Sequence, residues 1–422
     1  MKTNAIKITV WGRTVGYASW DKATRRALFQ YDREYVESGR ELSPFQMPLA
    51  SERSRRGMVW YGDTDKLYQG LPPMLADSLP DHWGNSIFNA WLRDNHIRSS
   101  EVTPLDLLSF IGRRAMGALE FEPAQELGGE NAFDVDVQKL YDFAREVLAA
   151  REAVMLTAER SVLWQDLIRL GTSPGGRRPK AVIAFNPTTG EAKSGQSDVP
   201  EGFIHYILKY DDGGAFPFAR MEYVYYRMAA AAGIEMMPSE LRDFGGVTHF
   251  LTQRFDREGN RKVHTQTLAA MAPGAASYDD LFEVIRRLRL PYKASEQQFL
   301  RMVFNVLGCN VDDHSKNFSF CMDRSGAWSL SPAYDVTFAV EASAPAYVNR
   351  HSLLVGGKDS GITLSDMLEV ARRNDIDRPK ELIERVKEAL ATFPAEARNA
   401  GVPDEVAGLV RRFLSDADRD AQ

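Results

Sequence analysis

The chain has few cysteines, no long hydrophobic run and no excess of basic residues. Its 422 residues include only two cysteines, Cys309 and Cys321, so a disulfide framework is excluded and we expect a reducing cytoplasm. We interpret both as packed small residues rather than a redox pair. The apolar runs are shorter than the roughly 18 residues of a membrane span, and the first residues lack the apolar core of a signal peptide, about 7–15 residues.

The charge balance argues against a protein built to bind nucleic acid. Lys and Arg number 52 and Asp and Glu 58, for a net charge of -6, whereas binding to a phosphate backbone requires a cationic surface. If the chain meets DNA, we expect a basic partner to bring it there. No His/Cys cluster has the spacing of a zinc site. With 44% hydrophobic and 26% charged residues, the composition is that of a soluble globular protein of about two to three domains.

The most informative stretch begins with a predicted helix and ends in a predicted hairpin. An apolar stripe at helical spacing precedes Gly308, which we expect to end the helix in a left-handed conformation. Residues 318–322 read as a short strand, 323–326 as its turn and 327–330 as the returning strand.

Ionisable residues fill the connection between this helix and hairpin. Asp312 and Asn317 are spaced as Asp-x-x-x-x-Asn, as in the catalytic loop of protein kinases, where the Asp accepts a hydroxyl proton and the Asn binds magnesium. Asp335, beyond the hairpin, offers a second metal-binding carboxylate at the end of a strand. The alternative is a solvated loop with Asx turns.

Two earlier segments have the residue types of a phosphate-binding site. Residues 171–180 read Gly-Thr-Ser-Pro-Gly-Gly-Arg-Arg-Pro-Lys, with glycines for close backbone approach and cations for charge. They do not form a Walker A motif, and a basic solvated turn is the alternative. Lys209 ends the next long strand, where a lysine can contact α/β-phosphates. Glu222, on a predicted helix over 219–232, either orients Lys209 or is an ordinary surface glutamate.

Several motifs together resemble HipA-type serine/threonine kinases, the toxins of bacterial toxin–antitoxin pairs. They are Asn-Val-Asp-Asp-His-Ser-Lys-Asn-Phe at 310–318, Pro-Ala-Tyr-Asp at 332–335, Ser-x-Gly-Gly-x-x-Pro-Lys at 173–180 and Leu-Pro-Asp-x-Trp-Gly at 79–84. The resemblance implies an α+β fold, a bilobal protein-kinase-like domain behind an N-terminal β-rich module. The expected divisions are a module at 1–127, a small lobe with the Gly-rich loop at 128–255 and a mostly helical large lobe with the catalytic loop at 256–422. We expect no catalytic chemistry from the module.

The resemblance also assigns roles to individual residues. Asp312 is the expected base, Lys316 the cation that neutralises the transferring phosphoryl, and Asn317 and Asp335 the Mg²⁺ ligands. The expected ATP-binding residues, with adenine held near Gln253 and Phe255, are Ser173, Gly175, Gly176, Lys180, Lys209, Gln253, Phe255 and Asn317. Ser173 stands seven positions before Lys180, as does the serine that these kinases phosphorylate in themselves to switch off.

The implied reaction is transfer of the ATP γ-phosphoryl group to a protein serine or threonine. The implied partners are a helix-turn-helix antitoxin repressor, through which alone the chain would meet DNA, and a translation-factor substrate such as an aminoacyl-tRNA synthetase. Two alternatives stay open, a non-catalytic degenerate kinase that acts only as corepressor with the antitoxin and a small-molecule kinase on the same scaffold.

Overall fold

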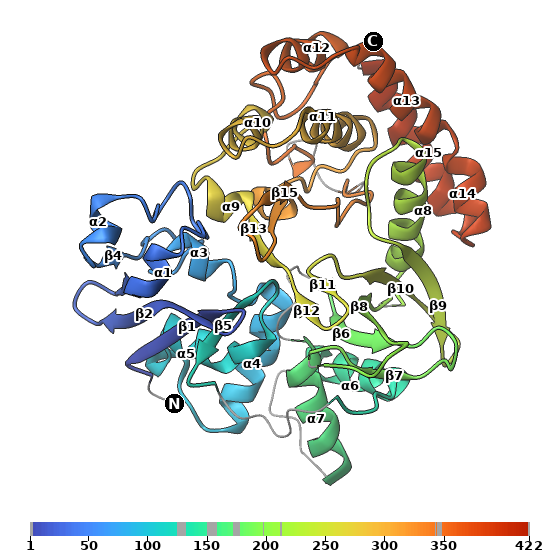
Figure 1. Cartoon of the computed structure of the whole chain (residues 1–422). Helices are drawn as coiled ribbons and strands as arrows, with labels where there is room; N and C mark the ends of the chain where they lie inside the picture. The colour runs from blue at the N-terminus through green and yellow to red at the C-terminus, as the bar shows by residue number, and fades with distance from the viewer. Residues whose placement is uncertain are drawn as a thin grey trace.

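The structure, a computed structural model, describes residues 3–124, 132–149, 158–171, 178–196, 198–211, 213–341, 343 and 348–420. Figure 1 shows the N-terminal part at one side of two larger bodies, one formed around a sheet and the other mainly of helices. Among the described residues, no helix combines the length and apolar character needed to cross a membrane.

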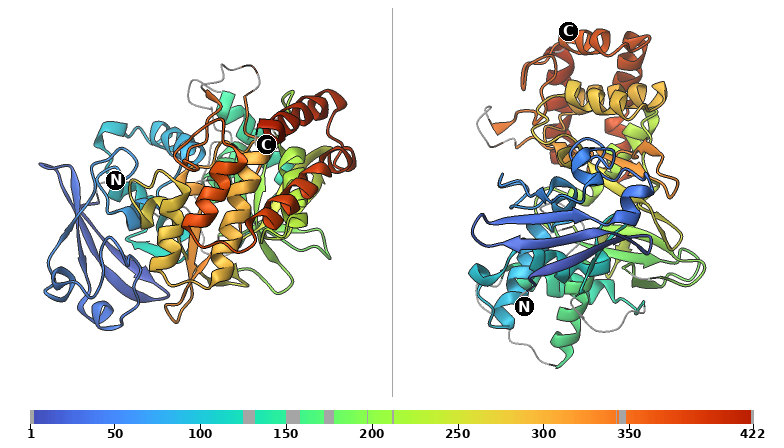
Figure 2. Two further views of the ribbon diagram at one scale, coloured as in Figure 1. Left: turned by 90° about the horizontal axis from the view of Figure 1, so that it is seen from above. Right: turned by 60° about the vertical axis from the view of Figure 1, so that its left-hand side comes forward.

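The N-terminal part is an antiparallel sheet with short helices packed against it. The strand order is β4-β3-β2-β1-β5, with β1 (Ala5–Val10), β2 (Arg13–Asp21), β3 (Arg26–Tyr31), β4 (Trp60–Tyr61) and β5 (Leu119–Glu122). The helices are α1 (Arg33–Glu37), α2 (Glu52–Arg55), α3 (Pro73–Ala76), α4 (His82–Asp94) and α5 (Pro104–Ile111). A capping box between Thr103 and Asp106 begins α5, with Pro104 in its first turn. Figure 2 shows this sheet from a second side.

The small lobe is built on a second antiparallel sheet. Its strand order is β7-β6-β8-β10-β9, with β6 (Lys180–Phe185), β7 (Ala192–Ser194), β8 (Ile204–Lys209), β9 (Ser239–Phe244) and β10 (Val247–Gln253). Two helices, α6 (Val137–Ala149) and α7 (Ala158–Gly171), pack at this sheet. One hydrophobic core runs from the N-terminal part into the lobe and includes Trp83, Ile87, Ile183 and Leu208. The N-terminal part is therefore joined to the small lobe by a shared core.

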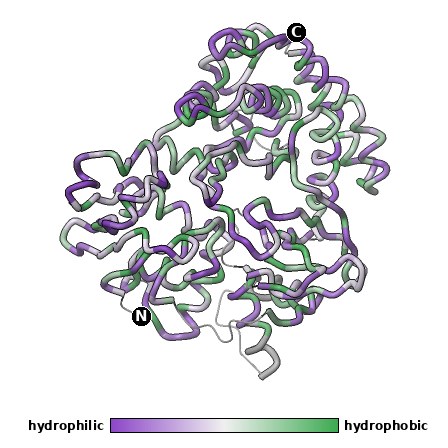
Figure 3. Tube along the Cα trace, viewed as in Figure 1, coloured by the Kyte–Doolittle hydropathy of each residue, from purple (hydrophilic) through white to green (hydrophobic). Residues whose placement is uncertain are grey.

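The large lobe is mostly helical. Its helices are α9 (Leu268–Met271), α10 (Tyr278–Arg287), α11 (Tyr292–Leu307), α12 (Leu364–Arg373), α13 (Pro379–Ala391), α14 (Phe393–Asn399) and α15 (Asp404–Asp420). Helix α8 (Phe218–Ala231) follows β8 in the chain but packs with α13 and α14, and its predicted apolar stripe lies in the core of the large lobe. In Figure 3, hydrophobic and hydrophilic segments alternate along these helices. The second core therefore connects the lobes through α8.

The predicted α+β class and β-rich N-terminal module are confirmed, with two local differences. The hairpin is β14 (Ser319–Met322) and β15 (Trp328–Leu330), but a third strand, β13 (His264–Thr267), pairs with β14 and was not predicted. The expected left-handed conformation at Gly308 was wrong, because Gly308 has φ −85° and Cys309 has φ +56°. A Cβ on Gly308 would lie 2.5 Å from the Phe304 carbonyl oxygen, so close approach explains this glycine. The division at 127 and 255 stays a prediction.

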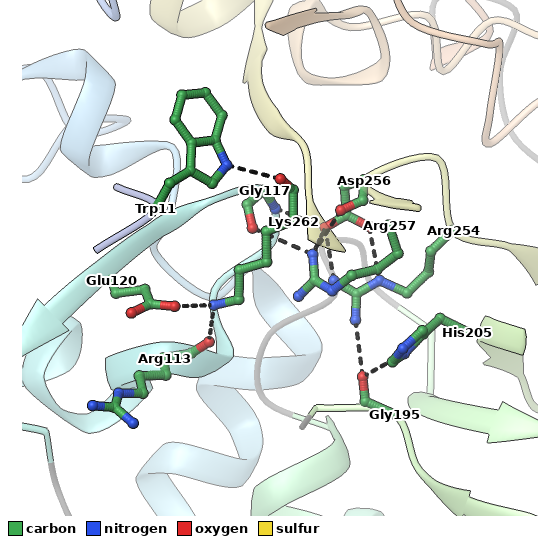
Figure 4. A network of polar contacts seen from close by, with 10 residues as sticks. All are labelled: Trp11, Arg113, Gly117, Glu120, Gly195, His205, Arg254, Asp256, Arg257 and Lys262. Carbon is green, nitrogen blue, oxygen red and sulfur yellow. Dashed lines mark hydrogen bonds and ion pairs between the residues drawn. The ribbon is translucent and has the colours of Figure 1, made fainter. Parts of the chain in front are cut away.

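A buried network of polar side chains joins the module to the chain between the lobes (Figure 4). Asp256 accepts two hydrogen bonds from Arg254, at 2.8 and 2.7 Å, and one from Arg257 at 2.8 Å. The Gly117 amide of the module donates to the same carboxylate at 2.7 Å. Nearby, Lys262 donates to Glu120 of β5 at 2.8 Å. The carboxylate of Asp256 therefore holds two buried guanidinium groups against the module.

We expect Asp256→Asn to lower the free energy of unfolding by about 3–5 kcal/mol, because it leaves two buried guanidinium groups uncompensated. Urea unfolding measures this loss. Glu258→Gln, an exposed neighbour, is the control and should change little. A loss equal to that of the control would contradict a stabilising role for this carboxylate.

The same network predicts a dependence of stability on pH. Burial by itself would raise the pKa of Asp256, but Arg254 and Arg257 outweigh burial and lower it. The stabilisation is therefore present above the unfolded-state pKa of about 3.9 and is lost as pH falls toward the lowered folded value. Urea unfolding of the wild type should show this loss below about pH 4, and Asp256→Asn should lack it.

Candidate active site

Two lysines lie opposite each other on neighbouring strands of the small lobe. Lys180 begins β6 and Lys209 ends β8, and the two residues are direct cross-strand partners. Lys180 is 3% exposed, and burial lowers its pKa. Like charges placed directly opposite destabilise a sheet, so this pair requires neighbouring anions.

Two carboxylates from different elements supply that negative charge. Lys209 Nζ donates to Glu222 Oε1 of α8 at 2.5 Å and also forms an ion pair with Asp335 from the loop after β15. Burial by itself would lower the pKa of Lys209, but the two carboxylates outweigh burial and raise it. Of the two alternatives for Glu222, the structure therefore shows the one in which it orients Lys209. We call these three residues the lysine–carboxylate cluster.

Asp335 itself lies in an uncommon backbone conformation. Its φ of +54° is left-handed, a region that Asp tolerates better than most residues. Burial would raise the pKa of Asp335, but Lys209 and Lys180 outweigh it, and the pKa lies below its usual range. Asp335 is thus a charged carboxylate at neutral pH. It lines one pocket together with Ile234, Arg301, Phe304, Asn305, Asn310, Asp313, Asn317, Phe318, Ala333, Tyr334 and Val336.

The predicted catalytic loop presents Asp312 at the surface. The Asp312 side chain is 64% exposed. The loop is closed by Asn317, whose Nδ2 donates to the Asp312 carbonyl oxygen at 2.7 Å. At the other side of the loop, Tyr334 Oη donates to the Lys316 carbonyl oxygen at 2.7 Å. These contacts fix the backbone on both sides of Lys316.

The next residue, Asp313, is the buried anchor of this loop. It is 1% exposed and accepts hydrogen bonds from Tyr278 Oη at 2.6 Å, His351 Nδ1 at 2.9 Å and the Ser352 amide at 2.7 Å. Asn305 extends the network by donating to Tyr278 Oη at 3.0 Å. Sequence reasoning assigned Asp313 no role, because an aspartate in this position does not show which way its side chain points.

Lys316 makes a contact that the sequence did not predict. Its Nζ donates to Asp81 Oδ1 of the N-terminal module at 2.6 Å. A side chain of the module, from which we expected no catalytic chemistry, therefore contacts a predicted catalytic residue. The Leu-Pro-Asp-x-Trp-Gly motif that contains Asp81 was the available signal, but the partner of Asp81 lies 235 positions away.

The remaining predicted residues are placed with less detail. Gln253 at the end of β10 and Phe255 beyond it are partly buried, and the Phe255 ring lies 5.4 Å from that of Tyr334. Ser173, Gly175 and Gly176 lie outside the described residues. The phosphate-cradle prediction for this loop is therefore untested.

The donor atoms at this site fit Mg²⁺. Magnesium prefers oxygen ligands and takes only one or two carboxylates in phosphate-binding sites. Asp335 offers a charged carboxylate, and Asn317 lines the same pocket. Because the Asn317 Nδ2 is engaged with Asp312, its amide oxygen is the atom left for a cation.

Comparison with known families matches two models along the chain. Residues 6–122 match the HipA N-terminal domain and residues 172–396 the HipA-like C-terminal domain. The second match alone covers more than half of the 422 residues.

Two curated relatives are similar at low identity. A putative kinase, Y4mE of Sinorhizobium fredii, is 25% identical over 220 residues, which are 44% of this chain and about half, 51%, of Y4mE. The serine/threonine-protein kinase toxin HipA of Shewanella oneidensis is 22% identical over 370 residues, 79% of this chain and 75% of that protein.

A solved structure has the same fold over almost the whole chain. It is the toxin–antitoxin complex of HipA, HipB and operator DNA from Shewanella oneidensis, with a TM-score of 0.68, 16% identity and coverage of 98% of this chain and 96% of that chain. The predicted kinase-like architecture is thereby confirmed at the level of the fold. With both family models matched in order, this chain belongs to the HipA family.

Proposed function

We propose that this chain is an ATP-dependent serine/threonine protein kinase that acts as the toxin of a toxin–antitoxin pair. The observation that carries the proposal is the lysine–carboxylate cluster, which joins a strand-end lysine, a helix glutamate and the aspartate of the pocket. A lysine–glutamate pair of this kind positions nucleotide phosphates in kinases. The relative from Shewanella oneidensis is named as a serine/threonine-protein kinase toxin, which supports the same reaction.

Each residue has one task in the proposed reaction. Lys209 contacts the α- and β-phosphates, and Lys316 neutralises charge on the transferring phosphoryl group. Asp312 accepts the proton of the substrate hydroxyl while the γ-phosphorus exchanges its bond to the bridging oxygen for a bond to the hydroxyl oxygen, and ADP leaves. Asn317 and Asp335 hold magnesium, which supplies positive charge to the phosphates when bound.

The proposed partners follow from the relatives. The solved relative was captured with HipB and operator DNA, and we propose a similar antitoxin for this chain, with DNA contacted through it. The net charge of -6 agrees with indirect DNA contact. An aminoacyl-tRNA synthetase is the substrate class that the family suggests. Labelled ATP incubated with the protein and a cell lysate tests the kinase against a non-catalytic corepressor and a small-molecule kinase.

We expect Asp312→Asn to lower transfer by about 10²–10⁴-fold, because the proton acceptor is gone. ATP binding measured by calorimetry should be retained, since the phosphate contacts remain. Asp377→Asn, an exposed aspartate of the large lobe, is the control. Turnover of Asp312→Asn close to that of the control would remove Asp312 from this role.

We expect Asp335→Ala to weaken ATP binding more strongly when magnesium is present than when EDTA is present, because the carboxylate acts through the metal as well as on Lys209. Glu222→Gln is the matched control, since Glu222 also contacts Lys209 but is no proposed ligand. It should weaken binding under both conditions. Calorimetry that shows the same magnesium dependence for Asp335→Ala as for the wild type would refute the metal role.

We propose Ser173 as an autophosphorylation site, although it lies outside the described residues. A phosphate there adds about −1.5 to −2 charge to the phosphate-binding loop and should repel ATP. Intact-mass analysis after incubation with ATP, with peptide mapping, should locate the phosphate at Ser173, and Ser173→Ala should lack it. Phosphorylated protein that binds ATP normally would exclude a switch.

A further inference from the structure

One short segment of the N-terminal module contacts both lobes beside the site. Asp77 accepts hydrogen bonds from the Thr267 amide at 2.7 Å and the Thr267 hydroxyl at 2.6 Å in the large lobe. Trp83 Nε1 donates to the Lys180 carbonyl oxygen of the small lobe at 2.9 Å. Asp81 lies between these two contacts in the chain and reaches Lys316. The segment therefore lies across the two lobes at the catalytic loop.

Asp81 stands at the N-cap of α4, where an aspartate side chain usually accepts a backbone N–H of the first turn. Here it makes no such cap hydrogen bond. Its Oδ1 instead accepts from Lys316 Nζ, and the two side chains are 28% and 24% exposed. Loss of an N-cap hydrogen bond destabilises a helix. Asp81 could cap the helix but does not, which indicates that its carboxylate serves the contact with Lys316 instead.

The ion pair with Lys316 has a counterpart elsewhere between the module and the rest of the chain. A second pair of the same type, Glu120 with Lys262 at 2.8 Å, joins the module to the rest of the chain with side chains 24% and 18% exposed. It lies in the network around Asp256 (Figure 4), and its lysine is Lys262 rather than Lys316. The two pairs thus have similar chemistry and exposure and differ in what the lysine does.

We propose that Asp81 is a positioning residue of the active site, supplied by the N-terminal module, which holds the Lys316 ammonium where the transferring phosphoryl group develops charge. The inference rests on the proposed kinase function. A free lysine side chain has many accessible rotamers, and a fixed carboxylate restricts that freedom before substrate binds. The module is then part of the catalytic machinery as well as a packing partner.

The test compares Asp81→Asn with Glu120→Gln in the full chain. We expect Asp81→Asn to lower kcat by about 10–10²-fold, since small displacements of a charged group are costly in catalysis, with KM for ATP little changed. Asp81→Glu should restore part of kcat. Glu120→Gln should leave kcat near that of the wild type. Equal losses for both variants would reduce Asp81 to a docking contact, and a rise in kcat would make the pair inhibitory; either result overturns the proposal.

Two further measurements separate positioning from other causes. In a Lys316→Met background, Asp81→Asn should have no additional effect, because the two residues act as one unit. Labelling of the Lys316 amine by acetic anhydride, with exposed Lys380 as internal reference, should be faster in Asp81→Asn than in the wild type. Unchanged labelling would overturn the contact. If the wild type transfers no phosphate, the kinase proposal fails, whereas the labelling still decides whether Asp81 holds Lys316.

Discussion

The repulsion between two lysines on neighbouring strands is the constraint on which the arrangement of the site depends. Lys180 and Lys209 are direct partners in the sheet, and a low-dielectric surrounding makes their repulsion stronger than it would be in water. Glu222 and Asp335 offset it from a helix and from a loop of the large lobe. Because Glu222 lies on α8 and Asp335 on the loop after β15, these ion pairs connect the strands of the small lobe to both elements.

The large lobe holds the neighbouring loop, which contains Asp312, through the buried side chain of Asp313. Asp313 is buried and accepts three hydrogen bonds, from Tyr278, His351 and Ser352. Both oxygens of its carboxylate are therefore engaged inside the protein. A buried polar network of this kind specifies one loop conformation when each member has a partner. The neighbouring Asp312 remains exposed as a result. Of the two adjacent aspartates, Asp313 supports the loop, whereas Asp312 is the one available for the proposed proton transfer.

The module adds a third set of contacts around the same site. Its core is continuous with that of the small lobe, and it reaches the large lobe through Asp77 and Asp81. The network around Asp256 holds it to the chain between the lobes. The module is therefore attached to both lobes at several places around the site.

Local pattern in the sequence determined the elements whose contacts are short-range. Periodicity and turn chemistry predicted the apolar stripe of α11 and the hairpin of β14 and β15. The spacing of Asp312 and Asn317 is also a short-range pattern, and the two residues are joined by a hydrogen bond. Strand β13 was not predicted, because His-Thr-Gln-Thr has no apolar alternation and forms a strand only where β14 offers a partner. The left-handed residue after α11 is Cys309 rather than Gly308, whose lack of a Cβ allows the close approach of the Phe304 carbonyl oxygen.

Tertiary structure alone decided the pairing of the charged residues. Lys209 and Asp335 are 126 positions apart, and Asp81 and Lys316 are 235 apart. No periodicity extends over such separations, and the direction of a charged side chain depends on which partner removes the cost of its burial. The sequence by itself indicated which residues are candidates for the proposed chemistry, whereas the packing of the module and the two lobes decided which of them meet.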